Sequence, residues 1–180
     1  MKENSVNKHF LFAMLSEKII DLKSNNKKIV LCHGVFDLLH IGHIKYFQEA
    51  KSMGAVLVVT ITPDRFVNKG HGRPAFNEKH RAEAIAALDV VDYVAINKWP
   101  TAIETIKALK PDLYVKGPDY KDYKEDVTGN IQLEEDAVKS IGGKIAFTSD
   151  ITFSSSSPIN QRIPVLKDKQ KKFIDKLKTK

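Results

Sequence analysis

The residues best suited to chemistry lie at 32–43, where the chain reads Cys-His-Gly-Val-Phe-Asp-Leu-Leu-His-Ile-Gly-His. His40 and His43 are three positions apart, so both rings would lie on one side of a helix that starts there. Two imidazoles in that position can donate hydrogen bonds to a polyphosphate as charge develops on it. Gly34 and Gly42 have no Cβ, which lets the backbone approach a phosphate closely at both places.

The position of this stretch supports an anion as its ligand. It follows an apolar run at 29–31 and precedes a helical pattern at 44–53. Ligands of open α/β sheets collect beyond the carboxyl ends of the strands, and a helix N-terminus offers unpaired N–H groups to anions. The alternatives are two ordinary surface histidines or two zinc ligands. A third metal ligand is not nearby in sequence, because Cys32, the chain's single cysteine, fits a small buried residue at a strand end.

The apolar periodicity predicts helices between nearly all successive strands. Such alternation requires parallel strands with right-handed crossovers, so we expect a doubly wound, Rossmann-like α/β fold with a five-stranded parallel sheet. Strands are expected at 29–32, 55–62, 93–96, 113–116 and 144–148, and helices at 6–23, 44–53, 78–88, 101–109 and 132–141.

Three further strand ends carry polar residues. The loop after residue 62 holds cations and two glycines, and residues 116–120 follow the next-to-last predicted strand. A run of four serines at 154–157, ahead of a proline, follows the last strand and is typical of a helix start. These loops suit a nucleoside triphosphate together with a second anionic substrate. A low-complexity linker is the alternative for the serines.

The chain has 180 residues, which fit one domain at 1–166 followed by a basic tail at 167–180 that is a helix or a linker. The tail holds seven lysines and two aspartates and so contributes +5 of the net charge of +7. The domain itself is nearly neutral, which does not indicate a nucleic-acid groove. No apolar run reaches the roughly 20 residues of a membrane span, and no secretory signal is evident, so we expect a cytoplasmic protein.

With these residues in view, the chain resembles the HxGH nucleotidyltransferase superfamily, and within it the cytidylyltransferase-like group, over about residues 28–160. It is similar to the adenylyltransferase domain of bacterial ADP-heptose synthase, especially in its middle portion, and to glycerol-3-phosphate cytidylyltransferase. The signature spans 34–43. Further matches are Lys69-Gly70, Arg73-Pro74, Arg81, Lys110-Pro111-Asp112, Val115-Lys116-Gly117 and Asp119-Tyr120.

The resemblance implies that a sugar or polyol phosphate attacks the α-phosphorus of a nucleoside triphosphate, releasing pyrophosphate and forming an activated sugar for a surface polysaccharide. It favours AMP transfer from ATP, with CTP-dependent cytidylyl transfer or a catalytically inactive nucleotide-binding module as alternatives. Mg²⁺ would be bound through the substrate phosphates. The implied partners are small molecules, with a homodimer and a fused or separate sugar kinase as possibilities.

The resemblance also implies a role for individual residues. Departures from the family pattern are the all-serine run, where relatives carry a Ser-Thr-Thr triplet, and Pro118. His33 could touch substrate or serve the structure. The implied catalytic residues are His40, His43 and Lys69; the implied nucleotide contacts are Gly34, Val35, Phe36, Asp37, Gly42, Lys116, Gly117, Asp119, Ser155, Ser156 and Ser157; the implied substrate contacts are Arg73, Arg81 and Tyr120.

Overall fold

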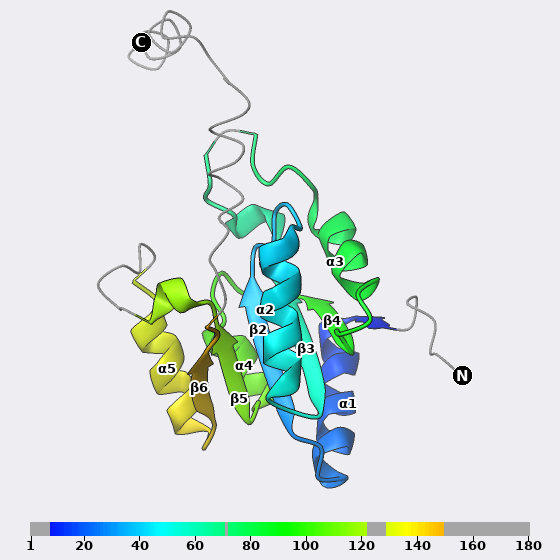
Figure 1. Cartoon of the computed structure of the whole chain (residues 1–180), viewed down its shortest axis with the longest axis vertical. Helices are drawn as coiled ribbons and strands as arrows, with labels where there is room; N and C mark the ends of the chain where they lie inside the picture. Colours follow the sequence, from blue (N-terminus) through cyan, green and yellow to red (C-terminus); the bar gives the residue numbers. More distant parts are fainter. Residues whose placement is uncertain (1–7, 71, 122–128, 150–180) are drawn as a thin grey trace, which may run out of the picture.

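The computed structural model describes residues 8–70, 72–121 and 129–149. In this part of the chain, six parallel strands form one sheet in the order β1-β4-β3-β2-β5-β6, with helices on both of its faces (Figure 1). The predicted Rossmann-like α/β fold class is confirmed. The elements are β1 (His9–Phe10), α1 (Phe12–Ser24), β2 (Ile29–Gly34), α2 (Ile41–Ser52), β3 (Val56–Ile61), η2 (Asp64–Phe66), α3 (Glu78–Ala86), β4 (Tyr93–Ile96), α4 (Ile103–Leu109), β5 (Leu113–Lys116), η3 (Pro118–Tyr120), α5 (Ile131–Ser140) and β6 (Lys144–Phe147).

The N-terminal region departs from the prediction of a helix over 6–23. Helix α1 starts only at Phe12, because His9–Phe10 forms an edge strand paired with β4. The ring of Phe10 packs edge-on against Tyr93, with centroids 5.4 Å apart. Phe10, the first large apolar residue of the predicted helical pattern, thus packs at the edge of the sheet. The sheet therefore has six strands instead of the predicted five. The predicted basic tail at 167–180 lies outside the described residues.

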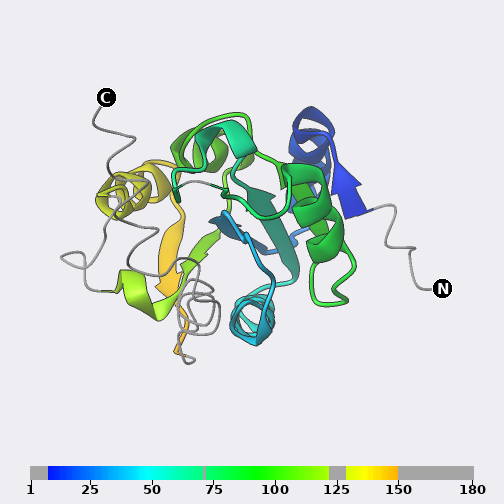
Figure 2. The same ribbon diagram turned by 90° about the horizontal axis from the view of Figure 1, so that it is seen from above.

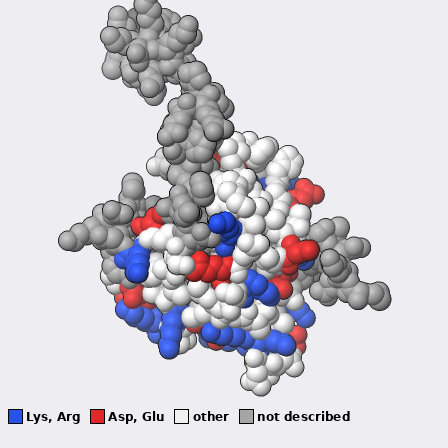
Figure 3. Space-filling model, viewed as in Figure 1, with Lys and Arg blue, Asp and Glu red and all other residues white. Residues whose placement is uncertain are grey.

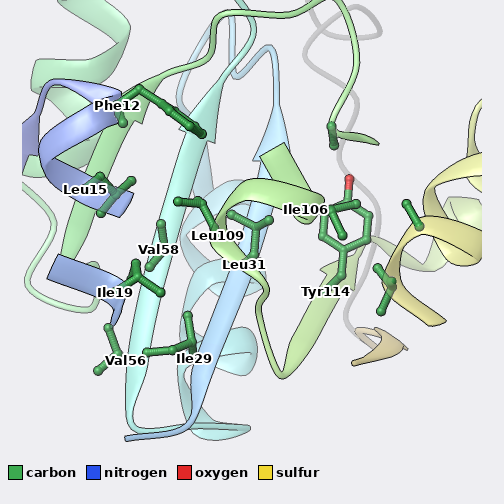
Figure 4. Packing of buried hydrophobic residues seen from close by; sticks show 14 residues of the cluster. Phe12, Leu15, Ile19, Ile29, Leu31, Val56, Val58, Ile106, Leu109 and Tyr114 are labelled. Atoms are coloured by element: carbon green, nitrogen blue, oxygen red, sulfur yellow. The ribbon is translucent and has the colours of Figure 1, made fainter. Parts of the chain in front are cut away.

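Two hydrophobic clusters hold the layers together. Along β2, Ile29 and Leu31 face the layer of α1, α4 and α5, whereas Val30 and Cys32 face α2 and α3. This alternation follows from the two-residue period of a strand. Figure 4 shows the first cluster, in which side chains of α1 and α4 meet those of the strands, and Figure 2 shows helices on either side of the sheet. Each central strand is apolar on both faces because both are covered.

The strand order fixes where a ligand can bind. From β2 the chain adds β3 and β4 on one side and then crosses to add β5 and β6 on the other. The carboxyl ends of the neighbouring strands β2 and β5 are therefore the topological switch point, where ligands of doubly wound sheets bind. This order brings the segment after Gly34 beside the segment after Lys116.

Within the described residues, no helix combines the length and the apolar character that crossing a bilayer requires.

One glycine between α5 and β6 is required for packing. A Cβ at Gly143 would lie 2.6 Å from the backbone oxygen of Pro111, whereas a Cβ at Gly117 would meet nothing within 4 Å. We predict that Gly143→Ala lowers the free energy of unfolding by about 1–3 kcal/mol, because a backbone atom cannot yield as a side chain can. Gly117→Ala should stay within about 0.5 kcal/mol of wild type. Urea titrations of both variants test this, and equal midpoints would contradict it.

Candidate functional site

The central feature of the site is the start of α2, where His40 caps the helix. His40 has an extended backbone, with φ −144° and ψ 172°, and its Nδ1 accepts a hydrogen bond from the backbone N–H of Gly42 at 3.1 Å. The helix therefore starts earlier than the predicted residue 44. A ring nitrogen that accepts a hydrogen bond carries no proton, so neutral His40 holds its proton on Nε2.

Each of the two signature histidines has one buried ring nitrogen without a hydrogen-bond partner among the described residues. Among the described residues, Nε2 of His40 is buried without a hydrogen bond, and Nδ1 of His43 has no partner of good geometry. The two rings are stacked, with centroids 3.8 Å apart and planes at 24°. Buried polar atoms are nearly always satisfied in folded proteins. The Nε2–H of His40 is thus a buried donor that no acceptor among the described residues satisfies.

Both histidines are neutral near pH 7. Burial, together with the nearby His40 and Lys69, lowers the pKa of His43 to about 4. Burial also lowers the pKa of His40. Each ring can donate one N–H to an anion, and binding of an anion would favour a second proton.

The ring of Phe36 explains why position 34 is a glycine. Phe36 lies in the left-handed region, with φ 48°, which is uncommon for a bulky residue and typical of functional sites. Its ring packs edge-on against His43, with centroids 5.3 Å apart. A Cβ at Gly34 would lie 3.0 Å from that ring. Gly34 therefore leaves space for the aromatic ring that supports His43, in addition to any role toward phosphate.

Arg81 holds the surrounding loops together. The residue is only 2% exposed, and its side chain donates to the carbonyls of Phe76 (3.0 Å), Thr62 (2.8 Å) and Val35, and to the Asp64 carboxylate (2.7 Å). Arg81 thus donates to four acceptors within the protein, and the substrate contact that the resemblance implies for it stays a prediction. It is a positioning residue that fixes the ends of β2 and β3.

Asp64 and Glu78 cap each other. Together with the contacts of Arg81, their bonds form a frame of loops around the site. The N–H of Asp64 donates to the Glu78 carboxylate at 2.8 Å, and the N–H of Glu78 donates to the Asp64 carboxylate at 3.0 Å. Two orphan donors at the start of η2 and α3 are thereby satisfied. The capping joins the loop after β3 to α3.

Asp37 and Arg73 bind each other. The buried Asp37 carboxylate accepts from the N–H of Ala75 at 2.6 Å and forms an ion pair with Nε of Arg73 at 2.8 Å. The Asp37 side chain therefore holds the 73–75 segment against the start of the signature, and the nucleotide contact that the resemblance implies for Asp37 stays a prediction. Lys69 lies on the same loop and is exposed. Desolvation of its ammonium group lowers its pKa. The charges of Arg73 and Arg81 lower this pKa as well, whereas the charge of Asp37 raises it.

Lys116 is also engaged within the protein. Its ammonium lies 3.1 Å from Glu134, which also accepts from the Tyr114 hydroxyl at 3.0 Å, and it lies 4.1 Å from the centre of the Tyr120 ring. A buried ammonium requires such a counter-charge. The nucleotide contact that the resemblance implies for Lys116 stays a prediction. Sequence reasoning did not single out Glu134. Its spacing of four residues from Val138 places both residues on one face of α5, and this spacing is the signal that could have indicated its burial.

The remaining expected contacts around β5 are more open. Gly117 follows Lys116 with space where a Cβ would be, Asp119 is exposed, and Tyr120 is half-buried. Ser155, Ser156 and Ser157 lie outside the described residues.

His33 contacts two threonine hydroxyls of the protein and thus has a structural role. Its Nδ1 lies 2.9 Å from the hydroxyl of Thr60, and its Nε2 lies 3.3 Å from the hydroxyl of Thr62. Burial, with a contribution from Lys116, lowers its pKa to about 3. A neutral imidazole thus links β2 to β3 just below the site.

The face shown in Figure 3 carries both Lys or Arg and Asp or Glu, and several of its Lys and Arg patches gather along the lower edge of the view. In the ranges that the structure describes, no group of three or more His, Cys, Asp or Glu is placed to hold a metal ion.

Comparison with known proteins agrees with the fold and the signature. The structure is similar to that of a lipopolysaccharide core biosynthesis protein from Thermoplasma volcanium, with a TM-score of 0.57 and 30% identity over 70% of this chain and 99% of that one. The bifunctional protein HldE of Geobacter metallireducens is 43% identical over 143 residues, and that of Campylobacter jejuni is 49% identical over 108 residues.

These matches cover 78% and 59% of this chain, but it spans only 28% and 23% of those two relatives. The model of the cytidylyltransferase-like family matches residues 31–162, from the middle of β2 to beyond the serine run. The signature histidines, the β5 end and the serines all fall within that match. The chain therefore belongs to the cytidylyltransferase-like family of nucleotidyltransferases.

Proposed function

We propose that this chain transfers an adenylyl group from ATP to a sugar phosphate, releasing pyrophosphate and forming an activated sugar for surface polysaccharide synthesis. The observation that carries this proposal is the unpartnered, buried Nε2–H of His40 at the N-terminus of α2. The identity with HldE proteins supports it, as does the likeness to a lipopolysaccharide core biosynthesis protein.

The reaction needs positioning and charge stabilisation more than covalent chemistry. An oxygen of the acceptor phosphate attacks the α-phosphorus, the bond from that phosphorus to the bridging oxygen of the β-phosphate breaks, and pyrophosphate leaves. His40 and His43 donate N–H groups to the phosphate oxygens as negative charge shifts toward the leaving group. Lys69 neutralises part of that charge from the exposed loop.

Mg²⁺ would arrive bound to the triphosphate, where it neutralises phosphate charge. The main chain at Val35, Phe36 and Gly42 would line the triphosphate, and Gly117 and Asp119 would lie near the base and ribose. The side chains of Ser155, Ser156 and Ser157 would bind phosphates. Arg73 and Tyr120 would line the acceptor side. We further propose that a kinase, separate or fused, supplies the sugar phosphate, and that the chain forms a homodimer.

Pyrophosphate release tests the proposed reaction. The chain is incubated with Mg²⁺, each of the four nucleoside triphosphates and a panel of sugar 1-phosphates. We expect release to be fastest with ATP, and we expect His40→Ala to slow it by about 10²- to 10³-fold, because an aimed donor is lost. His80→Ala removes an exposed histidine on α3 and should leave the rate unchanged. Release at the same rate in His40→Ala would refute the assignment of the site.

Arg81→Lys tests the loop frame. A lysine cannot reach four acceptors in one plane, so carbonyls of the site are left unsatisfied. We predict a loss of about 2–4 kcal/mol in the free energy of unfolding and a fall in kcat/KM. Arg65→Lys, on the exposed η2, should change stability by less than about 0.5 kcal/mol. Urea unfolding and initial rates measure both effects, and equal behaviour of the two variants would contradict the frame.

The pH dependence of stability tests the buried state of His43. Its pKa is about 4 when folded and 6.5 in the reference state, so the unfolded chain binds the extra proton first on acidification. Stability should therefore fall as the pH drops from about 6.5 toward 4, by up to about 1.4 kcal/mol per pH unit from this residue. His43→Gln should flatten the slope over this window. An unchanged slope in urea titrations at pH 7.5 and 5 would show that His43 titrates normally.

A further inference from the structure

We propose that Tyr46 on α2 is a positioning residue that bridges the switch point and fixes the spacing between two sides of the nucleotide site. The histidine side is the start of α2 with His40 and His43, and the β5 side is the segment 117–119. The Tyr46 hydroxyl donates a hydrogen bond to the carbonyl of Val115 on β5 at 2.5 Å, and the two residues are 69 positions apart. The inference rests on the proposed function, because that function assigns one nucleotide to both sides.

The bridge lies across the pairing of β2 with β5. Val115 pairs in register with Cys32 on β2, and both residues belong to the cluster between the sheet and the layer of α2 and α3. The Cys32 thiol also lies within hydrogen-bonding reach of the Tyr46 hydroxyl. One phenol oxygen therefore meets both strands at the place where the strand order reverses, which is where ligands of this fold bind.

The ring of Tyr46 connects the bridge to His43. The two residues are three positions apart in α2, so their side chains are neighbours on one face of the helix. The ring of Phe36 packs against both, with its centroid 5.3 Å from that of His43 and 6.5 Å from that of Tyr46. Holding Tyr46 against Val115 therefore also holds His43 at a fixed distance from β5.

The β5 end of the bridge leads directly into the proposed base and ribose contacts. Gly117 follows Val115 by two residues, and two residues span at most about 7 Å. ATP bound as proposed touches the histidine side with its triphosphate and the β5 side with its nucleoside. A ligand that touches both sides gains affinity when their spacing is set in advance, because less freedom is lost on binding. The bridge should therefore favour ATP over a ligand that touches one side alone.

Both side chains of the bridge are neutral. Burial is the main cause that raises the pKa of the Tyr46 hydroxyl well above its usual value, and the nearby Cys32 raises it further. Burial likewise raises the pKa of the Cys32 thiol to about 12. The Tyr46 hydroxyl therefore keeps its proton near pH 7 and stays a donor to Val115. Since the acceptor is a main-chain carbonyl, a substitution at Tyr46 is the direct way to remove the bond.

Two ligands separate a positioning role from general support of the fold. Tyr46→Phe removes the hydroxyl and keeps the ring that packs against Phe36. Tyr93→Phe makes the same change at the amino end of β4, at the opposite edge of the sheet from the site, and is the matched control. Calorimetry measures the Kd of ATP with Mg²⁺ and the Kd of inorganic tripolyphosphate with Mg²⁺, which carries no nucleoside.

We expect Tyr46→Phe to raise the Kd of ATP by about five- to tenfold, as for the loss of one neutral hydrogen bond, and that of tripolyphosphate by less than about twofold. Tyr93→Phe should change neither. An unchanged Kd of ATP in Tyr46→Phe, or an equal rise for both ligands, would overturn the positioning role.

Amide hydrogen exchange without nucleotide tests the bridge apart from the proposed function. Amides of residues 115–120 should exchange faster in Tyr46→Phe than in wild type, with those of β4 and α5 unchanged. Equal exchange in the two proteins would overturn the bridge, whether or not the chain binds ATP. A wild-type chain that neither binds ATP nor releases pyrophosphate from any triphosphate would refute the proposed function, and the positioning role with it.

Discussion

The hydrogen bond from the Gly42 N–H to Nδ1 of His40 is the interaction on which the site depends. It caps α2, and it fixes the tautomer of the imidazole that caps it. One bond thus sets where the helix starts and which nitrogen carries the proton. The stacked ring of His43 follows from the same helix start, because the two residues share one side of its first turn. The four residues 40–43 therefore determine both the start of α2 and the protonation of the His40 ring.

Around this start, the polar residues divide into two groups with different tasks. One group is satisfied within the protein, such as Arg81 with its carbonyls and Oδ1 of Asp37 with the N–H of Ala75. The other group, with Nε2 of His40 at its centre, is left without partners in the described chain. The first group makes the second possible, because unpaired donors keep their positions only where the surrounding chain is held firmly.

The sequence predicted what depends on local pattern. Residues 93–96 and 113–116 form the expected strands, and the β2-to-α2 turn carries the signature histidines. Long-range pairings were not readable, because a residue type does not reveal its partner. Nothing in the sequence pattern pairs Lys116 with Glu134, which lies 18 positions along the chain. Phe10 belongs to a strand because it pairs with β4, and this pairing was not readable from the sequence because β4 lies far along the chain.

Three of the four acceptors of Arg81 are main-chain carbonyls, which every amino acid supplies. Substitutions at Phe76, Val35 or Thr62 can therefore accumulate in evolution without removing the acceptor that the guanidinium needs. Inheritance of the frame then depends on one arginine, while the side chains that line the site are free to diverge. A nucleotidyltransferase built in this way can acquire a new acceptor substrate without first having to rebuild its scaffold.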